Sequence, residues 1–110
     1  MTNPKHIINP SPVAEQLRTH IESLLNSAGI RHGNDTDVQF YSSEAWDARG
    51  EYCGNAAELS MIFEGALYRI INNPFDQSDR DLASLILTAG EQFGLQASFG
   101  FAWSLHFYAR

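Results

Sequence analysis

The residues best suited to chemistry or recognition lie in one acidic stretch in the middle of the chain. Residues 35–64 hold seven acidic side chains and one basic one, Arg49, whereas the rest of the chain carries acids and bases in equal number. The acids of the stretch are Asp35, Asp37, Glu44, Asp47, Glu51, Glu58 and Glu64. The stretch therefore carries the whole net charge of −6.

Three of these acids have a spacing that acid–base chemistry can use. Glycoside hydrolysis needs two carboxylates about 5–10 Å apart around a cleft, and Glu44, Asp47 and Glu51 permit such a pair. Nothing selects this chemistry, because solvated loop acids have the same pattern. A small enzyme with Glu44 or Asp47 as the acid or base and His106 as a second titrating group is kept as an alternative.

Metal and thiol chemistry have less support. The available nitrogen and sulfur ligands are His6, His20, His32, His106 and Cys53. They show none of the short Cys and His spacings that are typical of zinc sites. Cys53 lies near Glu51, whose charge disfavours the reactive thiolate. We therefore predict no metal, no cofactor and no catalytic residue.

The aromatic residues of the acidic stretch favour recognition instead. Trp46 and Tyr52 lie among acids, and aromatic residues ringed by charge dominate many interfaces. Either ring can instead close the core beneath a loop, and the sequence leaves both interpretations open. The predicted partner-binding residues are Glu44, Trp46, Asp47, Arg49, Glu51, Tyr52, His106 and Tyr108. The last two lie on the polar face of the expected C-terminal strand.

Charge restricts the class of partner. A net charge of −6 with one lysine disfavours direct binding to nucleic acid and to anionic membranes, which require basic residues. The same charge favours a protein partner with a basic surface. We predict a non-enzymatic acidic protein-binding module, with an inhibitor or accessory protein of a nucleic-acid-handling partner as its most specific form. Its composition is shared by many such proteins of phages and plasmids.

The cysteine count and the apolar runs indicate the compartment. Cys53 is the only cysteine, so no intrachain disulfide can form, which favours a reducing environment. No apolar run approaches the length of roughly 18 residues that a membrane span requires. The N-terminal residues do not resemble a signal peptide. We therefore expect a cytoplasmic protein.

A small scaffold must position the acidic stretch. The prolines of residues 1–10 predict an extended arm, and residues 11–110 predict one domain. Ser11 and Pro12 form a good helix start, as N-cap and first helical residue. Apolar residues then recur at helical spacing until Gly29, which ends the helix.

The next elements alternate between strand and helix patterns. Residues 38–41 and 57–63 read as short strands. The interval 42–56 is either a functional loop or an extension of the hairpin. A short helix is expected over 65–73, and a second helix begins at a Ser78 cap.

Residues 95–108 alternate apolar and polar side chains, which predicts one amphipathic strand. Such a strand would span about 46 Å, although a domain of this length has a radius of gyration of only about 13 Å. The alternation stays in phase across Gly100, which favours a strong twist over a bulge. A strand that overhangs and pairs with a second copy, giving a homodimer, is a further alternative.

The order helix, strand, strand, helix, helix, strand predicts an α+β fold. Each expected strand has one apolar face, so we expect an antiparallel sheet of three or four strands with two to three helices packed on one face.

Overall fold

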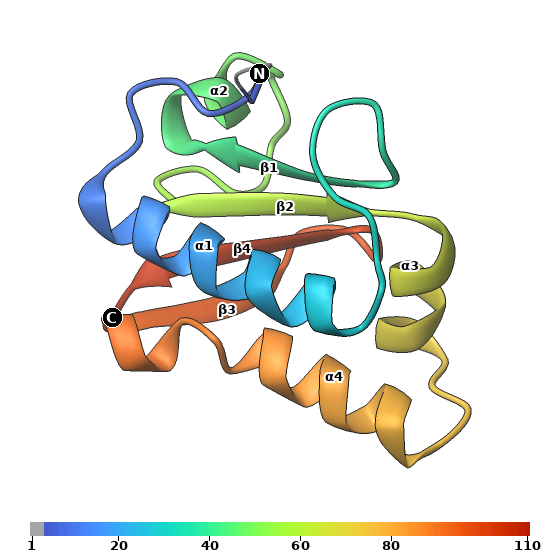
Figure 1. The fold of residues 1–110 in the computed structure, drawn as a ribbon. Coiled ribbons are helices and arrows are strands. Elements are labelled where there is room, and N and C mark those ends of the chain that lie inside the picture. The colour runs from blue at the N-terminus through green and yellow to red at the C-terminus, as the bar shows by residue number, and fades with distance from the viewer. Residues whose placement is uncertain (1–3) are drawn as a thin grey trace.

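The computed structural model describes residues 4–110, which form a four-stranded antiparallel sheet flanked by helices (Figure 1). The elements in chain order are α1 (Pro12–Ser27), β1 (Val38–Ser42), α2 (Ser43–Asp47), β2 (Leu59–Phe63), α3 (Gly65–Asn72), α4 (Gln77–Leu87), the 3₁₀ helix η1 (Glu91–Phe93), β3 (Leu95–Phe99) and β4 (Ser104–Ala109). The predicted α+β fold is confirmed.

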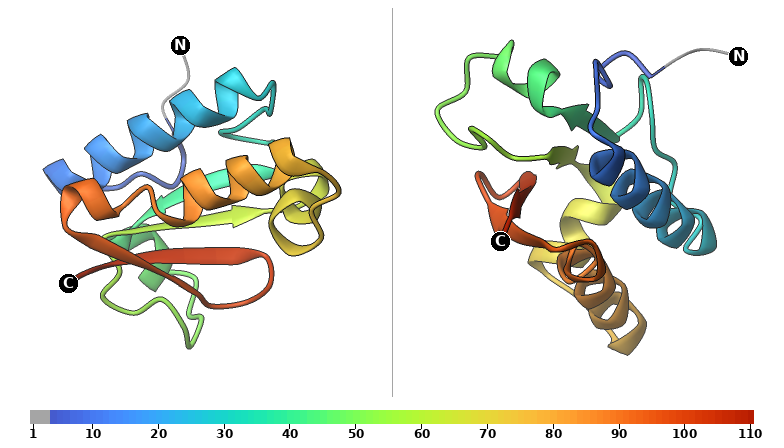
Figure 2. Two further views of the ribbon diagram at one scale, coloured as in Figure 1. Left: turned by 90° about the horizontal axis from the view of Figure 1, so that it is seen from below. Right: turned by 90° about the vertical axis from the view of Figure 1, so that its left-hand side faces the viewer.

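The strands follow the order β1-β2-β4-β3, and each neighbouring pair is antiparallel. Helices α1 and α4 cover one face of the sheet, whereas α2 and the segment that follows it lie against the other face (Figure 2). The main core fills the space between the helices and the sheet, with Leu17, Ile21, Met61, Ile86 and Phe107 all fully buried.

Helix α1 begins and ends as the sequence predicts. The Ser11 hydroxyl accepts a hydrogen bond from the Ala14 amide at 3.2 Å, which satisfies one of the amides that a helix start leaves unpaired. Gly29 follows the helix with a φ of +72°, a conformation that glycine adopts without strain. No helix within residues 4–110 combines the length and apolar character needed to cross a membrane.

The N-terminal arm packs against the end of β1, although residues 1–3 of the predicted arm lie outside the described part of the chain. The Ser42 amide donates to the His6 carbonyl at 2.9 Å, and the Ile8 amide donates to the Ser42 hydroxyl at 2.8 Å. The His6 ring stacks on Tyr41 at 4.2 Å between centroids. Backbone and ring contacts therefore fasten the arm to its own chain.

Helix α4 begins slightly earlier than predicted. Asp76, rather than Ser78, is the N-cap, and its side chain accepts from the Asp79 amide at 2.9 Å. Both residue types cap helices well. The earlier cap adds residues to the first turn of the helix.

The prediction of one continuous strand over 95–108 is wrong. The chain reverses after Phe99 and returns as β4, with Phe99 opposite Leu105 in the register. The Gly100 amide donates to the Ser104 carbonyl at 3.1 Å and closes the turn. A strand of the expected length would also exceed every dimension of the molecule, whose extents are 37 × 33 × 24 Å.

The alternation of apolar and polar residues over 95–108 did not predict this turn, for a geometric reason. Paired residues in the β3–β4 register are both odd or both even, as in Ala97 with Phe107. Residues of equal parity therefore share a sheet face on both strands, and the pattern continues through the reversal as if no turn existed.

The interval 42–56 is neither a bare loop nor a hairpin extension. Ser42 ends β1 and also caps α2. Its hydroxyl accepts from the Ala45 amide at 3.5 Å. The chain from Ala48 to Glu58 then follows an irregular path to β2.

Candidate protein-binding surface

Three aromatic rings from two chain segments form a continuous cluster where the irregular segment meets the β3–β4 turn. Tyr52 contacts Phe101 edge to face at 5.9 Å, and Phe101 stacks on Trp103 at 4.6 Å with the rings 10° apart. Tyr52 is 86% exposed, whereas Phe101 and Trp103 are half-buried. We call Tyr52, Phe101 and Trp103 the aromatic ladder.

The Arg49 side chain contacts Trp103 of the aromatic ladder and the buried Trp46. Its guanidinium carbon lies 4.9 Å from the centre of the Trp46 ring and 5.8 Å from that of Trp103. One of its nitrogens donates to the Tyr41 hydroxyl at 2.8 Å, and another lies 3.3 Å from a Glu51 oxygen. Stacking and hydrogen bonding of this kind suit the planar guanidinium. Arg49, predicted to contact a partner, is thus engaged within its own domain.

Trp46 closes a second, smaller core beneath this surface. Its ring is buried, and its indole N–H donates to the Cys53 carbonyl at 2.7 Å. It meets the Tyr41 and His106 rings edge to face. The sequence left open whether Trp46 and Tyr52 close the core or face a partner, and the two rings turn out to differ. Trp46 lies in the core and offers no surface to a partner, whereas Tyr52 is exposed.

His106 is also sealed inside. It has no exposed surface, and its ring nitrogens lie 2.7 Å from the Ser60 hydroxyl and 3.0 Å from the Ser104 hydroxyl. A Cβ at Gly54 would lie 2.6 Å from the ring, and one at Gly100 would also clash with it, so only glycine fits at either position. Burial lowers the pKa of His106 to about 4. The ring is neutral at pH 7 and out of reach of any partner or substrate.

The polar face of the sheet is open only in part. The sequence predicts a flat polar surface with His106 and Tyr108 on it, but α2 and the irregular segment cover the side formed by β1, β2 and β4 (Figure 2). Tyr108 lies half-buried at the rim, opposite Gln96 of β3 in the register. Burial raises the pKa of its hydroxyl, so Tyr108 is neutral at pH 7.

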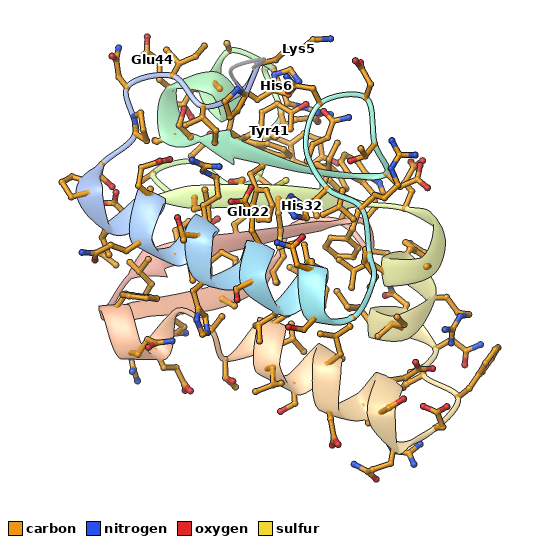
Figure 3. The ribbon with its side chains drawn as sticks, viewed as in Figure 1. Lys5, His6, Glu22, His32, Tyr41 and Glu44 are labelled. Carbon is orange, nitrogen blue, oxygen red and sulfur yellow. The ribbon has the colours of Figure 1, made fainter. Side chains whose placement is uncertain are left out.

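The three predicted acids differ in how they relate to the aromatic ladder. Glu44 and Asp47 are exposed on α2. The Glu44 carboxylate accepts from the Asn9 side-chain amide at 2.9 Å, and Figure 3 shows Glu44 beside the N-terminal arm. Glu51 is half-buried and paired with Arg49. Glu51 therefore places one carboxylate beside the aromatic ladder, whereas Glu44 and Asp47 add negative charge on α2.

Cys53 is not arranged as a nucleophile. Its sulfur lies 3.9 Å from the nearer nitrogen of His106. Burial, and to a smaller extent the Glu51 carboxylate, raise the pKa of the thiol. Because the nucleophile is the thiolate, the dominant protonated form is unreactive at neutral pH.

A cavity of about 270 Å³ lies between the arm, α1 and β1. Glu22 at its wall lies 3.1 Å from Arg18 and 3.4 Å from His32, and Figure 3 shows the Glu22 and His32 side chains converging. These polar groups satisfy one another. Within residues 4–110 no three His, Cys, Asp or Glu side chains gather as a metal-binding group. The sequence did not predict this cavity, because it depends on where the arm docks.

Sequence reasoning also missed two members of the aromatic ladder. It placed Phe101 and Trp103 on the apolar face of one long strand, whereas the turn carries both toward Tyr52. The available signal was Gly100, which interrupts a run of side chains at a position suited to a sharp bend.

Comparison of the chain with protein families, curated proteins and solved structures gives no match. The aromatic ladder is therefore defined by its own geometry.

Proposed function

We propose that this chain is a non-enzymatic protein-binding module whose contact surface is the aromatic ladder, with Glu44, Asp47 and Glu51 as acids that steer a basic partner toward it. The observation that carries the proposal is the position of Tyr52, 86% exposed and braced edge to face against Phe101. A braced ring loses little conformational freedom on binding. Its burial by a partner removes a large apolar area from water.

The charge around the ladder defines the chemistry of the partner. The acidic stretch 35–64 carries the whole net charge of −6, and it includes Glu44, Asp47 and Glu51. Such a field attracts a surface rich in lysine and arginine and repels an acidic one. Nucleic-acid-handling proteins present basic surfaces of this kind, so inhibition or support of such a protein is the most specific form of the proposal. The single cysteine is in keeping with a cytoplasmic setting.

The enzymatic alternative loses its second titrating group. It required His106 to act together with Glu44 or Asp47, but His106 is fully buried and hydrogen-bonded to Ser60 and Ser104. A general acid or base must reach the substrate directly or through one water. No observation on the described residues favours catalysis over binding.

Affinity capture from the native host tests the proposal with two matched variants. Tyr52→Ser removes the exposed ring of the ladder, and Phe75→Ser removes another ring, which is 70% exposed between α3 and α4. We expect the wild type and Phe75→Ser to capture the same basic protein and Tyr52→Ser to lose it, with the circular dichroism spectra unchanged. Equal capture by Tyr52→Ser would contradict the proposal.

A further inference from the structure

The two edges of the sheet differ, and the β1 edge is covered at both of its ends by the chain itself. The Val38 carbonyl accepts from the Gly33 amide and from the Thr36 hydroxyl, both at 2.8 Å. At the other end of the strand, the Ser42 amide donates to the His6 carbonyl at 2.9 Å. Occupied backbone groups of this kind prevent an edge from pairing with another chain.

The opposite edge is β3, and its register shows which backbone groups point outward. The Gly100 amide donates to the Ser104 carbonyl, and the Arg110 amide donates to the Gly94 carbonyl. These bonds flank the ladder between β3 and β4. Because hydrogen-bonded and non-hydrogen-bonded pairs alternate, the even-numbered residues of β3 bond to β4. The odd-numbered residues direct their amides and carbonyls away from the sheet.

Most of these outward groups are available. The Leu95 amide donates to the Gly90 carbonyl at 2.9 Å. The amides of Ala97 and Phe99 and the carbonyls of Leu95 and Ala97 face outward with no backbone partner along residues 4–110. This side of β3 is a short row of alternating donors and acceptors, the template on which another strand adds.

The sequence of β3 contains none of the residues that usually keep an edge strand from pairing with another chain. Natural edge strands carry lysine, proline or inward-pointing charge. Residues 95–109 contain no Asp, Glu, Lys, Arg or Pro. Phe99, at the end of β3, is 48% exposed, so pairing would also remove apolar surface from water.

We propose that β3 pairs antiparallel with β3 of a second copy of this chain, about a twofold axis at Ala97. The Ala97 residues of the two copies exchange N–H···O bonds, and each Phe99 amide donates to the Leu95 carbonyl of the other copy. Leu95 then lies opposite Phe99 on the apolar face. Gln96 lies opposite Ser98 on the polar face, so side chains of like character meet across the junction. The sheet becomes continuous through both copies.

Charge supports a second copy rather than a basic partner at this edge. The acidic stretch 35–64 runs through β1, α2 and β2, and β3 is the edge of the sheet opposite β1 (Figure 1). A junction at β3 keeps the acidic stretches of the two copies apart, so their repulsion is screened over distance. A basic partner finds no carboxylate to pair with along residues 95–109.

Light scattering over a range of protein concentrations tests the pairing. We expect the wild type to reach twice the chain mass of 12.3 kDa as the concentration rises. Ala97→Pro should stay monomeric, because it removes an outward N–H without breaking a bond to β4, and Phe75→Ser should dimerise like the wild type. A monomer at every concentration, or a dimer indifferent to Ala97→Pro in a folded variant, would overturn the proposal.

Cross-linking tests the register independently. In the proposed pairing, Gln96 and Ser98 of opposite copies form a non-hydrogen-bonded pair with Cα atoms about 4.5 Å apart, within the range for a disulfide. In a Cys53→Ser background, Gln96→Cys/Ser98→Cys should form a covalent dimer on mild oxidation, whereas Gln96→Cys alone should not. Equal cross-linking by both variants would overturn the register.

Hydrogen exchange distinguishes a second copy from another occupant. We expect the Ala97 and Phe99 amides to gain protection as the concentration of this chain rises. Protection that appears only when a different polypeptide is added would overturn the assignment to a second copy. Tyr52→Ser should leave dimerisation intact, so failure of the dimer and failure of the proposed ladder surface are separable.

Discussion

At the scale of single residues, the most unusual group is the neutral imidazole of His106. Ser60 and Ser104 satisfy its nitrogens, the Trp46 ring meets it edge to face at 4.7 Å, and Gly54 leaves no space above it. Among residues 4–110, no acidic side chain pairs with the ring. Protonation would therefore place an uncompensated charge in the interior.

This environment predicts a pH dependence of stability with a definite sign. The pKa of His106 falls to about 4 in the folded chain from 6.5, so the unfolded chain binds more protons between these values. The free energy of unfolding should fall as pH falls through this window, by up to about 3 kcal/mol at 1.36 kcal/mol per pKa unit. Denaturant unfolding as a function of pH measures the effect.

The control for this prediction is His106→Asn, which keeps a polar group between the two serines but cannot titrate. Its unfolding free energy should depend less on pH between 4 and 6.5 than that of the wild type. The pKa of His6 is also lowered, mainly by burial and then by the charges of Lys5 and Arg49. His6→Asn therefore measures how much His6 contributes to the pH dependence of stability. A His106→Asn variant with the full wild-type slope would show that His106 is not the source.

The two aromatic residues of the acidic stretch should differ sharply in their effect on stability. Trp46→Ala empties a buried site and should cost about 3–5 kcal/mol of unfolding free energy. Tyr52→Ser removes an exposed ring and should change it by no more than about 0.5 kcal/mol. Urea titration of both variants checks the difference, and similar costs would contradict the assigned burial.

At the scale of elements, the sequence predicted those parts that local signals define. Helix α1 follows from Ser11, Pro12 and Gly29, each of which acts through its own backbone geometry. The turn at Gly100 could not be predicted by periodicity, because the register preserves the parity of the side chains. The aromatic ladder depends on that turn, so two of its three members were beyond the reach of local patterns.

Gly100 provides an element-scale prediction. A Cβ at this position would clash with His106 and would lie 2.7 Å from the Cys53 sulfur. Gly100→Ala should therefore overpack the site and cost about 1–3 kcal/mol, whereas Ser98→Ala, on the exposed polar face of the same hairpin, should cost about 0.5 kcal/mol or less. Thermal unfolding compares the two, and an unaffected Gly100→Ala would contradict the close cover over His106.

At the scale of the whole molecule, charge and apolar surface are separated along the sheet. The acidic stretch 35–64 occupies β1, α2 and β2, whereas the β3–β4 hairpin carries no acid or base between residues 95 and 109. The proposed partner-binding surface spans both parts, because Tyr52 lies in the acidic stretch and Phe101 and Trp103 lie in the turn of the hairpin. The proposed self-association edge lies in the uncharged half. Pairing at β3 uses outward backbone groups, whereas the aromatic ladder uses side-chain rings, so the two proposed contacts do not draw on the same groups.

Charge reversal on α2 should change the association rate constant for the partner more than the dissociation rate constant. Asp47→Lys places a cation on α2, within the acidic stretch, and should slow binding to the captured partner and reduce its salt dependence. Asp81→Lys makes the same change of net charge on the exposed surface of α4 and serves as the control. Surface plasmon resonance at two salt concentrations separates the rates, and equal slowing by both variants would implicate net charge rather than the acidic side chains of α2.

The most direct test of the central claim is a calorimetric titration of the purified captured partner into the wild type, Tyr52→Ser and Phe75→Ser. If the aromatic ladder is the contact surface, loss of the Tyr52 ring should remove at least about 2 kcal/mol of binding free energy, the size of an interface hot spot, or roughly 30-fold in Kd. Phe75→Ser should bind like the wild type. A Tyr52→Ser variant that binds as tightly as the wild type would contradict the account.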